Sequence, residues 1–120
     1  MEKSDSNPSD DQQPPILDEA TALETAADDP ELVDLLRTTC LQEAPKIIAQ
    51  ARQAVTDSDW KTARRSGHSL RSSFRAIGAL AASEESGQLE EVELDNPEDF
   101  IAAIEVIETA MQKLLDHLGA

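Results

Sequence analysis

The spacing of apolar residues between Trp60 and Ile77 constrains the fold of this chain more than any other feature. Apolar or small side chains recur there at steps of three and four residues: Trp60, Ala63, Gly67, Leu70, Phe74 and Ile77. Such steps place one side chain per turn on a single face of an α-helix. The segment is therefore predicted to be a helix that buries one seam in a helical bundle.

The same spacing of apolar residues at three and four positions recurs in other segments, which are separated by short stretches of helix-ending residues. We expect a short helix over 16–27, a long helix from Pro30 to Val55, and two more over 79–94 and 97–118. Asp29-Pro30 and Asn96-Pro97 are N-cap and first-turn pairs, which mark helix starts. The apolar stripe of the long helix is predicted to comprise Leu32, Leu36, Thr39, Cys40, Ile47, Ala51 and Val55.

Pro45 interrupts that long pattern. Because its ring conflicts with the carbonyl of Leu41, we expect a kink or a local break in the helix there. No strand pattern is present, and only three residues are aromatic: Trp60, Phe74 and Phe100. The predicted fold is all-α: an antiparallel up-down four-helix bundle with a short extra N-terminal helix. The domain is predicted to span 16–120, after a polar, proline-bearing and disordered tail over 1–15.

Composition limits the partners of this domain. The 120 residues carry a formal net charge of −15, which argues against nucleic acid as a ligand. No apolar run approaches the roughly 20 residues of a membrane span, and no signal peptide is present. The single cysteine, Cys40, excludes an internal disulfide and is predicted to be a core residue. We therefore expect a cytoplasmic protein. We also expect a monomer, since no unpaired apolar seam remains once the bundle closes.

His68 lies in a basic stretch of this acidic chain. From Trp60 to Gly78 the sequence has no acid and five basic residues, namely Lys61, Arg64, Arg65, Arg71 and Arg75. At about 100° per residue, His68 falls roughly 140° from the centre of the predicted seam, so its ring is expected to face solvent. A neutral imidazole is a nucleophile, and nearby cations favour an anion, for which phosphate is the obvious candidate.

A simpler interpretation exists, because a single surface histidine is usually a spectator and a charged helix face is usually only solvated. The joint pattern argues against it: an outward histidine, five cations, and small residues around it at Gly67, Ser69, Ser72 and Ser73. Small residues on an exposed helix face are poor helix formers. They are understandable if a partner must approach closely. His117, near the end of the last helix, is predicted to be a spectator.

The segment His68-Ser69-Leu70-Arg71-Ser72, followed by Gly78-Ala79 and Leu89-Glu90, resembles the histidine-containing phosphotransfer (HPt) domain. That family's pattern is His-x-Leu-Lys-Gly, then Gly-Ala, then Leu-Glu. The resemblance covers roughly 16–118 and implies that His68 is the phospho-acceptor. It places Arg71 where the family usually has Lys, near the phosphoryl group, and Ser72 where it usually has Gly, at the docking surface. We add Arg64, Arg65 and Arg75 to the predicted phosphate- and partner-binding residues.

The resemblance implies a phosphorelay intermediate of two-component signal transduction. His68 would accept a phosphoryl group from a receiver-domain phospho-aspartate and pass it to another receiver. The partners would be response-regulator receiver domains, a hybrid histidine kinase, or both. No nucleotide-binding loop is present, so a carrier without kinase activity of its own is expected. We expect no cofactor and no bound metal, with magnesium on the receiver. Two alternatives remain: a phosphorylation-inactive adaptor, and a structural bundle whose basic patch binds an anionic ligand.

Overall fold

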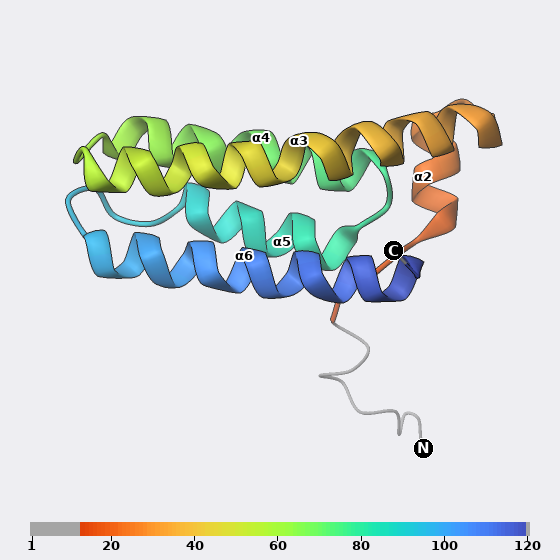
Figure 1. Cartoon of the computed structure of the whole chain (residues 1–120). Coiled ribbons are helices and arrows are strands. Elements are labelled where there is room, and N and C mark those ends of the chain that lie inside the picture. The colour runs from red at the N-terminus through yellow and green to blue at the C-terminus, as the bar shows by residue number, and fades with distance from the viewer. Residues whose placement is uncertain (1–12, 120) are drawn as a thin grey trace, which may run out of the picture.

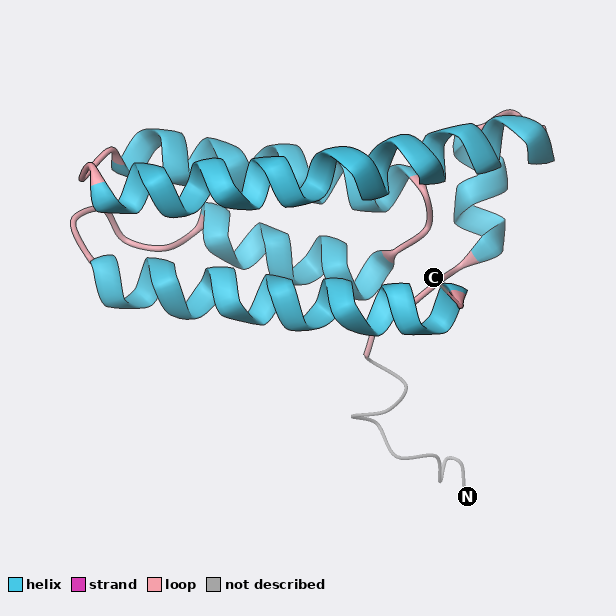
Figure 2. Ribbon diagram, in the orientation of Figure 1, coloured by secondary structure: helices cyan, strands magenta, loops and turns pink. Residues whose placement is uncertain are grey.

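The computed structural model describes residues 13–119, and these form helices without any strand. In chain order the helices are α2 (Glu19–Thr25), α3 (Pro30–Thr56), α4 (Trp60–Ala76), α5 (Leu80–Glu90) and α6 (Pro97–Leu118). Figures 1 and 2 show the four longer helices lying alongside one another, with α2 at one end. The expected all-α fold is confirmed. Of the predicted tail over 1–15, residues 1–12 lie outside the described part.

Polar side chains cap the starts of four helices, because the first backbone N–H groups of a helix have no partner within it. Asp18, Asp29, Asp59 and Asn96 accept these hydrogen bonds for α2, α3, α4 and α6. The predicted starts at Pro30, Trp60 and Pro97 are confirmed. Hydrogen bonds from the side chain and the backbone of Thr62 also lower the pKa of Asp59.

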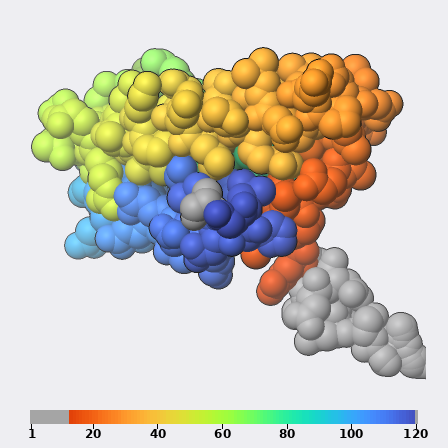
Figure 3. All heavy atoms as spheres, turned by 45° about the vertical axis from the view of Figure 1, so that its right-hand side comes forward, coloured from red at the N-terminus to blue at the C-terminus, as the bar shows by residue number. Residues whose placement is uncertain are grey.

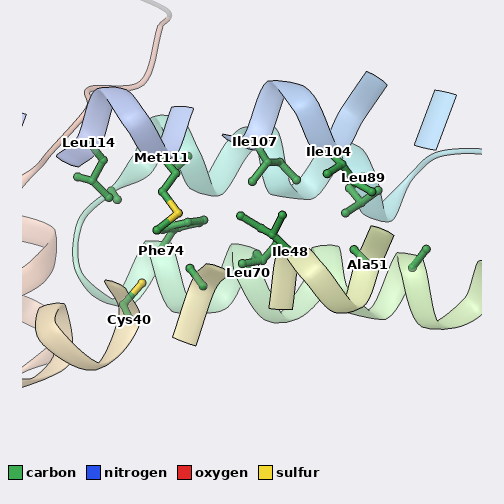
Figure 4. Close-up of a cluster of buried hydrophobic side chains, with 14 of the residues drawn as sticks. Cys40, Ile48, Ala51, Leu70, Phe74, Leu89, Ile104, Ile107, Met111 and Leu114 are labelled. Carbon is green, nitrogen blue, oxygen red and sulfur yellow. The ribbon is translucent and has the colours of Figure 1, made fainter. Parts of the chain in front are cut away.

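One apolar core joins α3, α4, α5 and α6 (Figure 4). The predicted seam of α4 is confirmed, since Ala63, Leu70 and Phe74 are fully buried. The predicted faces of α5 and α6 are buried as well, through Ala82, Ser86, Leu89, Phe100, Ile104, Ile107, Met111 and Leu114. Trp60 stacks on Phe100 with ring centroids 5.5 Å apart. Cys40 is buried, as predicted, and this burial raises the pKa of its thiol to about 11.

The predicted face of α3 is wrong in its first turns. Leu32 is exposed, and Val33 is buried in its place. The reason is α2, whose Ala22 and Ala26 form a separate small cluster with Val33. Figure 3 shows this end of the molecule, with the first turns of α3 in orange above the N-terminal segment and α2. An ion pair between Arg37 and Glu19, 3.0 Å long, also joins α2 to α3.

The structure also differs from two further predictions, the break in α3 and the end of α5. The local break expected at Pro45 is absent, because α3 is helical from Pro30 to Thr56. Pro45 is exposed, while its neighbour Ala44 and Ile48 in the next turn are buried, so the helix packs against the core on both sides of the proline. The helix predicted over 79–94 ends at Glu90, and Leu94 is exposed in the loop that leads to α6.

The segment before α2 is tied to the turn between α4 and α5. The backbone N–H of Asp18 donates to the carbonyl of Gly78 over 2.7 Å, and that of Ala81 donates to Pro15 over 2.9 Å. Gly78 has φ +77°, and a Cβ there would lie 2.1 Å from the carbonyl oxygen of Asp18. Glycine is needed at this turn both for its backbone conformation and for this close approach.

Candidate functional site

His68 lies on the exposed face of α4, as predicted, and 56% of its side-chain surface is accessible. The adjacent Gly67 is buried against α5. A Cβ at Gly67 would lie 2.9 Å from the backbone nitrogen of Glu90 and 2.9 Å from the carbonyl oxygen of Ser86. The backbones of α4 and α5 therefore meet closely beside His68, which brings the last turn of α5 within reach of the imidazole.

The side chain of Glu90, in this last turn of α5, contacts both His68 and Arg71. Its Oε2 lies 2.9 Å from Nδ1 of His68, and its Oε1 lies 3.4 Å from Nε of Arg71. The interpretation of His68 as an imidazole ringed only by cations is therefore wrong, since α5 supplies a carboxylate. Glu90 belongs to the Leu89-Glu90 pair that resembles the family pattern, but the sequence alone predicts no role for it. The pair could have indicated this position: because Leu89 is a core residue, the next residue of the helix points toward the edge of α5.

These contacts assign the proton of the imidazole. A ring nitrogen 2.9 Å from a carboxylate oxygen is a hydrogen-bond donor, so in the neutral imidazole the proton lies on Nδ1 and the lone pair on Nε2. Nη2 of Arg71 also lies 3.4 Å from Nδ1, but a protonated Nδ1 cannot accept from it. Arg71 is instead held by Glu90. Within residues 13–119, Nε2 has no hydrogen-bond partner and is free to act as a nucleophile.

The remaining basic residues of α4 do not converge on His68. Arg64 is half-buried, and its Nε donates to the carbonyl oxygen of Val92 over 2.7 Å, which ties α4 to the loop after α5. Lys61, Arg65 and Arg75 are exposed. Arg71 is the one cation within hydrogen-bonding distance of His68 among the described residues. The roles assigned to the other arginines stay predictions.

A hollow between α4 and α5 begins one helical turn beyond His68. It has a volume of about 520 Å³, and its lining comprises Arg71, Ser72 and Arg75 from α4, Leu80, Ser83 and the carboxylate of Glu84 from α5, and Pro14 from the segment before α2. Ser83 is fixed there, because its hydroxyl donates to the carbonyl oxygen of Arg71 over 3.0 Å. Arg71 thus connects the imidazole to a concave surface with two guanidinium groups at its edge.

Comparison with known families agrees with this geometry. The family model for the Hpt domain matches residues 35–120, so the chain belongs to the histidine-containing phosphotransfer (Hpt) domain family. Hpt domains carry phosphoryl groups in phosphorelays, interact with receiver domains or kinases, and are not kinases themselves. No curated protein and no solved structure matches the chain.

Two further properties bear on the site. In the part of the chain that the structure describes, no group of three or more His, Cys, Asp or Glu side chains is placed to hold a metal ion. None of the helices described is long and apolar enough to cross a bilayer.

Proposed function

We propose that this protein is a phosphorelay carrier that accepts a phosphoryl group on Nε2 of His68 from an aspartyl phosphate and passes it to a second receiver. One observation carries the proposal: the Glu90 carboxylate fixes Nδ1 of an exposed imidazole, so that the lone pair of Nε2 is turned toward solvent. A partner's phosphate can reach that nitrogen without any rearrangement of the bundle.

The transfer needs no base. Nε2 attacks the phosphorus atom in line, the N–P bond forms, and the bond from phosphorus to the aspartate oxygen breaks. The leaving group is a carboxylate, and the phosphorylated ring becomes cationic while Nδ1 keeps its proton. The Glu90 carboxylate, 2.9 Å from Nδ1, stabilises that cation and keeps the ring oriented. Glu90 is thus a positioning residue. Attack by a second aspartate on the same phosphorus reverses these steps.

Arg71 supplies positive charge beside the phosphorylated ring. Its Nη2 lies 3.4 Å from Nδ1 of His68, and its Nε pairs with Glu90 at 3.4 Å. A guanidinium tethered this way neutralises part of the phosphoryl charge when the side chain turns outward. Ser72 and Arg75 line the adjacent hollow, and we assign that surface to the docking of the receiver. Arg64 and Arg65 extend the positive face that attracts an acidic partner.

The proposal also covers the arrangement of the helices, the location and oligomeric state of the protein, and its partners and cofactors. We propose an antiparallel up-down arrangement of the four long helices, which the alternating ends of their connections in Figure 1 support. We also propose that the protein works as a cytoplasmic monomer with receiver domains or a hybrid kinase as partners. On this proposal it carries no cofactor, and the magnesium ion of the reaction belongs to the receiver.

Phosphoryl transfer from a phosphorylated receiver tests the proposal. The wild-type protein is expected to acquire acid-labile, base-stable phosphate, and His68→Gln is expected to acquire none. Glu90→Gln keeps an oxygen that accepts from Nδ1 but loses the charge, so we expect slower transfer than in wild type and faster transfer than in Glu90→Ala. Label that persists in His68→Gln would disprove the assignment. Receiver binding without any phosphorylated form in wild type would indicate the inactive adaptor.

Docking has its own test. Ser72→Trp fills the hollow beside Arg71 and is expected to weaken receiver binding at least tenfold, while the helical circular dichroism spectrum stays unchanged. Lys61→Ala is the control, since Lys61 is exposed on α4 but does not line the hollow. Equal affinities for wild type and Ser72→Trp would place the docking surface elsewhere.

A further inference from the structure

A second hollow lies between α5 and α6, and α4 contributes none of its lining. Its volume is about 810 Å³, and apolar side chains from both helices line it: Ala81 from α5 and Ala102, Val106 and Ala110 from α6. The segment before α2 closes one side through Pro14 and Ile16. It adjoins the hollow between α4 and α5, with which it shares Pro14 and Glu84, but none of its lining comes from α4, the helix that carries His68.

Within residues 13–119, part of the apolar lining of this hollow is left uncovered, contrary to the expectation that the closed bundle leaves no unpaired apolar seam. Val106 is 43% exposed and Ile16 is 36% exposed, although both are large aliphatic residues. Ala102, Val106 and Ala110 follow one another at steps of four and form one face of α6. A smaller hollow of about 330 Å³, lined partly by Pro97 and Ile101, continues along α6 and shares Ala102. The apolar track therefore runs about 20 Å along α6 between residues 97 and 110, at 1.5 Å per residue. That length suits a docked helix of several turns.

Carboxylates surround this track. Glu84 and Glu85 from α5 and Glu105 from α6 line the larger hollow. Within residues 13–119 none of the three forms an ion pair with a basic side chain. Lys113 is the single basic residue of the described lining. An apolar floor with an acidic rim is complementary to a helix that has one apolar face and basic residues beside it.

Charge also decides between the possible occupants. A second copy of the chain carries a net charge of −15, and its basic helix α4 has no free apolar face to offer, because the apolar seam of α4 is buried in its own bundle. Residues 1–12 of the chain itself include four acidic residues and one lysine, so they too have the wrong sign. We infer that the groove between α5 and α6 docks a cationic amphipathic helix of another protein, on a face that leaves His68 open to a receiver.

A synthetic peptide tests the inference. The probe is an amphipathic helix of about 18 residues, five turns, with Leu and Ala on one face and Lys on the rest. Its control is a peptide of the same composition in scrambled order, which has the same charge and no apolar face. We expect the amphipathic peptide to bind and to shift the NMR amide signals of Ala102, Val106 and Ala110. Scrambling the peptide is expected to weaken binding at least tenfold.

Two protein variants locate the binding. Val106→Glu places a carboxylate on the apolar floor and is expected to weaken binding at least tenfold. Leu35→Glu is the matched control, because Leu35 is 61% exposed on α3 and does not line the groove, and its affinity is expected to equal that of wild type. Equal binding of the scrambled peptide, or of Val106→Glu, would show that charge alone is responsible and would overturn the inference. Absence of binding would overturn it as well.

The binding assay does not depend on phosphoryl chemistry, so His68→Gln is expected to bind the peptide as wild type does. Failure of the proposed phosphoryl transfer would leave this result unaffected. Where transfer does occur, it is expected to continue at saturating peptide. A block of transfer by the peptide would mean that the peptide also covers His68 or the adjoining receiver surface, which contradicts docking on a face that leaves His68 open to a receiver.

Discussion

The close approach of α4 and α5 at Gly67 predicts a specific sensitivity to one added methyl group. In Gly67→Ala the new Cβ would lie 2.9 Å from the backbone nitrogen of Glu90, 2.9 Å from the carbonyl oxygen of Ser86, and 3.0 Å from Cβ of Leu89. Two of these atoms belong to the backbone of α5, so the contact cannot be relieved by the rotation of a side chain. The helix α5 must move away from α4.

The size of the effect follows from two opposing contributions. Overpacking of this kind costs about 1–3 kcal/mol, and the upper end applies because backbone atoms are involved. Replacing glycine by alanine inside a helix stabilises it by about 1 kcal/mol. The expected net loss in the free energy of unfolding is about 2 kcal/mol, which corresponds to a fall in Tm on the order of 10 °C.

Gly87→Ala is the matched control on the facing helix. A Cβ at Gly87 would meet Cδ of Arg71 at 3.2 Å, and that atom belongs to a flexible, half-exposed side chain. The gain in helix propensity of up to about 1 kcal/mol should therefore be kept. Urea unfolding followed by circular dichroism measures both variants. Gly67→Ala is also expected to slow phosphorylation of His68, because a displaced α5 withdraws Glu90. Equal stability of the two variants would refute this account of the interface.

Three further predictions concern Cys40, Asp59 and Pro45. Because burial raises the pKa of Cys40 from 9.0 to about 11, its reaction with a disulfide reagent at pH 8 should be at least about 100-fold slower than that of a free thiol, and urea should restore the rate. The pKa of Asp59 is lowered in the fold, so its stabilisation is present above the ordinary value of 3.8 and is lost as the pH falls further. The stability difference between wild type and Asp59→Asn should therefore disappear in acid thermal scans. Pro45→Ala restores a helical N–H and should raise the free energy of unfolding by up to about 3 kcal/mol in urea titrations; a decrease would contradict this.

The part of the fold that follows from local periodicity could be predicted from the sequence. The seam of α4, the capped starts of three helices and the outward direction of His68 depend on residues within a few turns of one another. The face of α3 depends on what packs against it. Val33 is buried rather than Leu32 because α2 covers the first turns of α3. The spacing of apolar residues within α3 does not predict that contact.

In the site, too, some features follow from the local sequence and others depend on the packing of one helix against another. Its nucleophile could be predicted from α4 alone, because both the helix and the outward face are local properties. Glu90 lies 22 residues after His68 in the sequence, so their contact depends on the relative rotation and spacing of α4 and α5. Gly67 sets that spacing through contacts with the backbone of α5. A glycine in the buried seam therefore contributes to a site whose chemistry lies on the adjacent, exposed face of the helix.

The stacking of Trp60 on Phe100 has a practical consequence for every experiment on this protein. Trp60 is the single tryptophan and the chain has no tyrosine, so intrinsic fluorescence excited near 295 nm comes from one position. That indole joins the first turn of α4 to the first turn of α6. Its emission therefore reports whether those two helix ends remain together, without any attached dye.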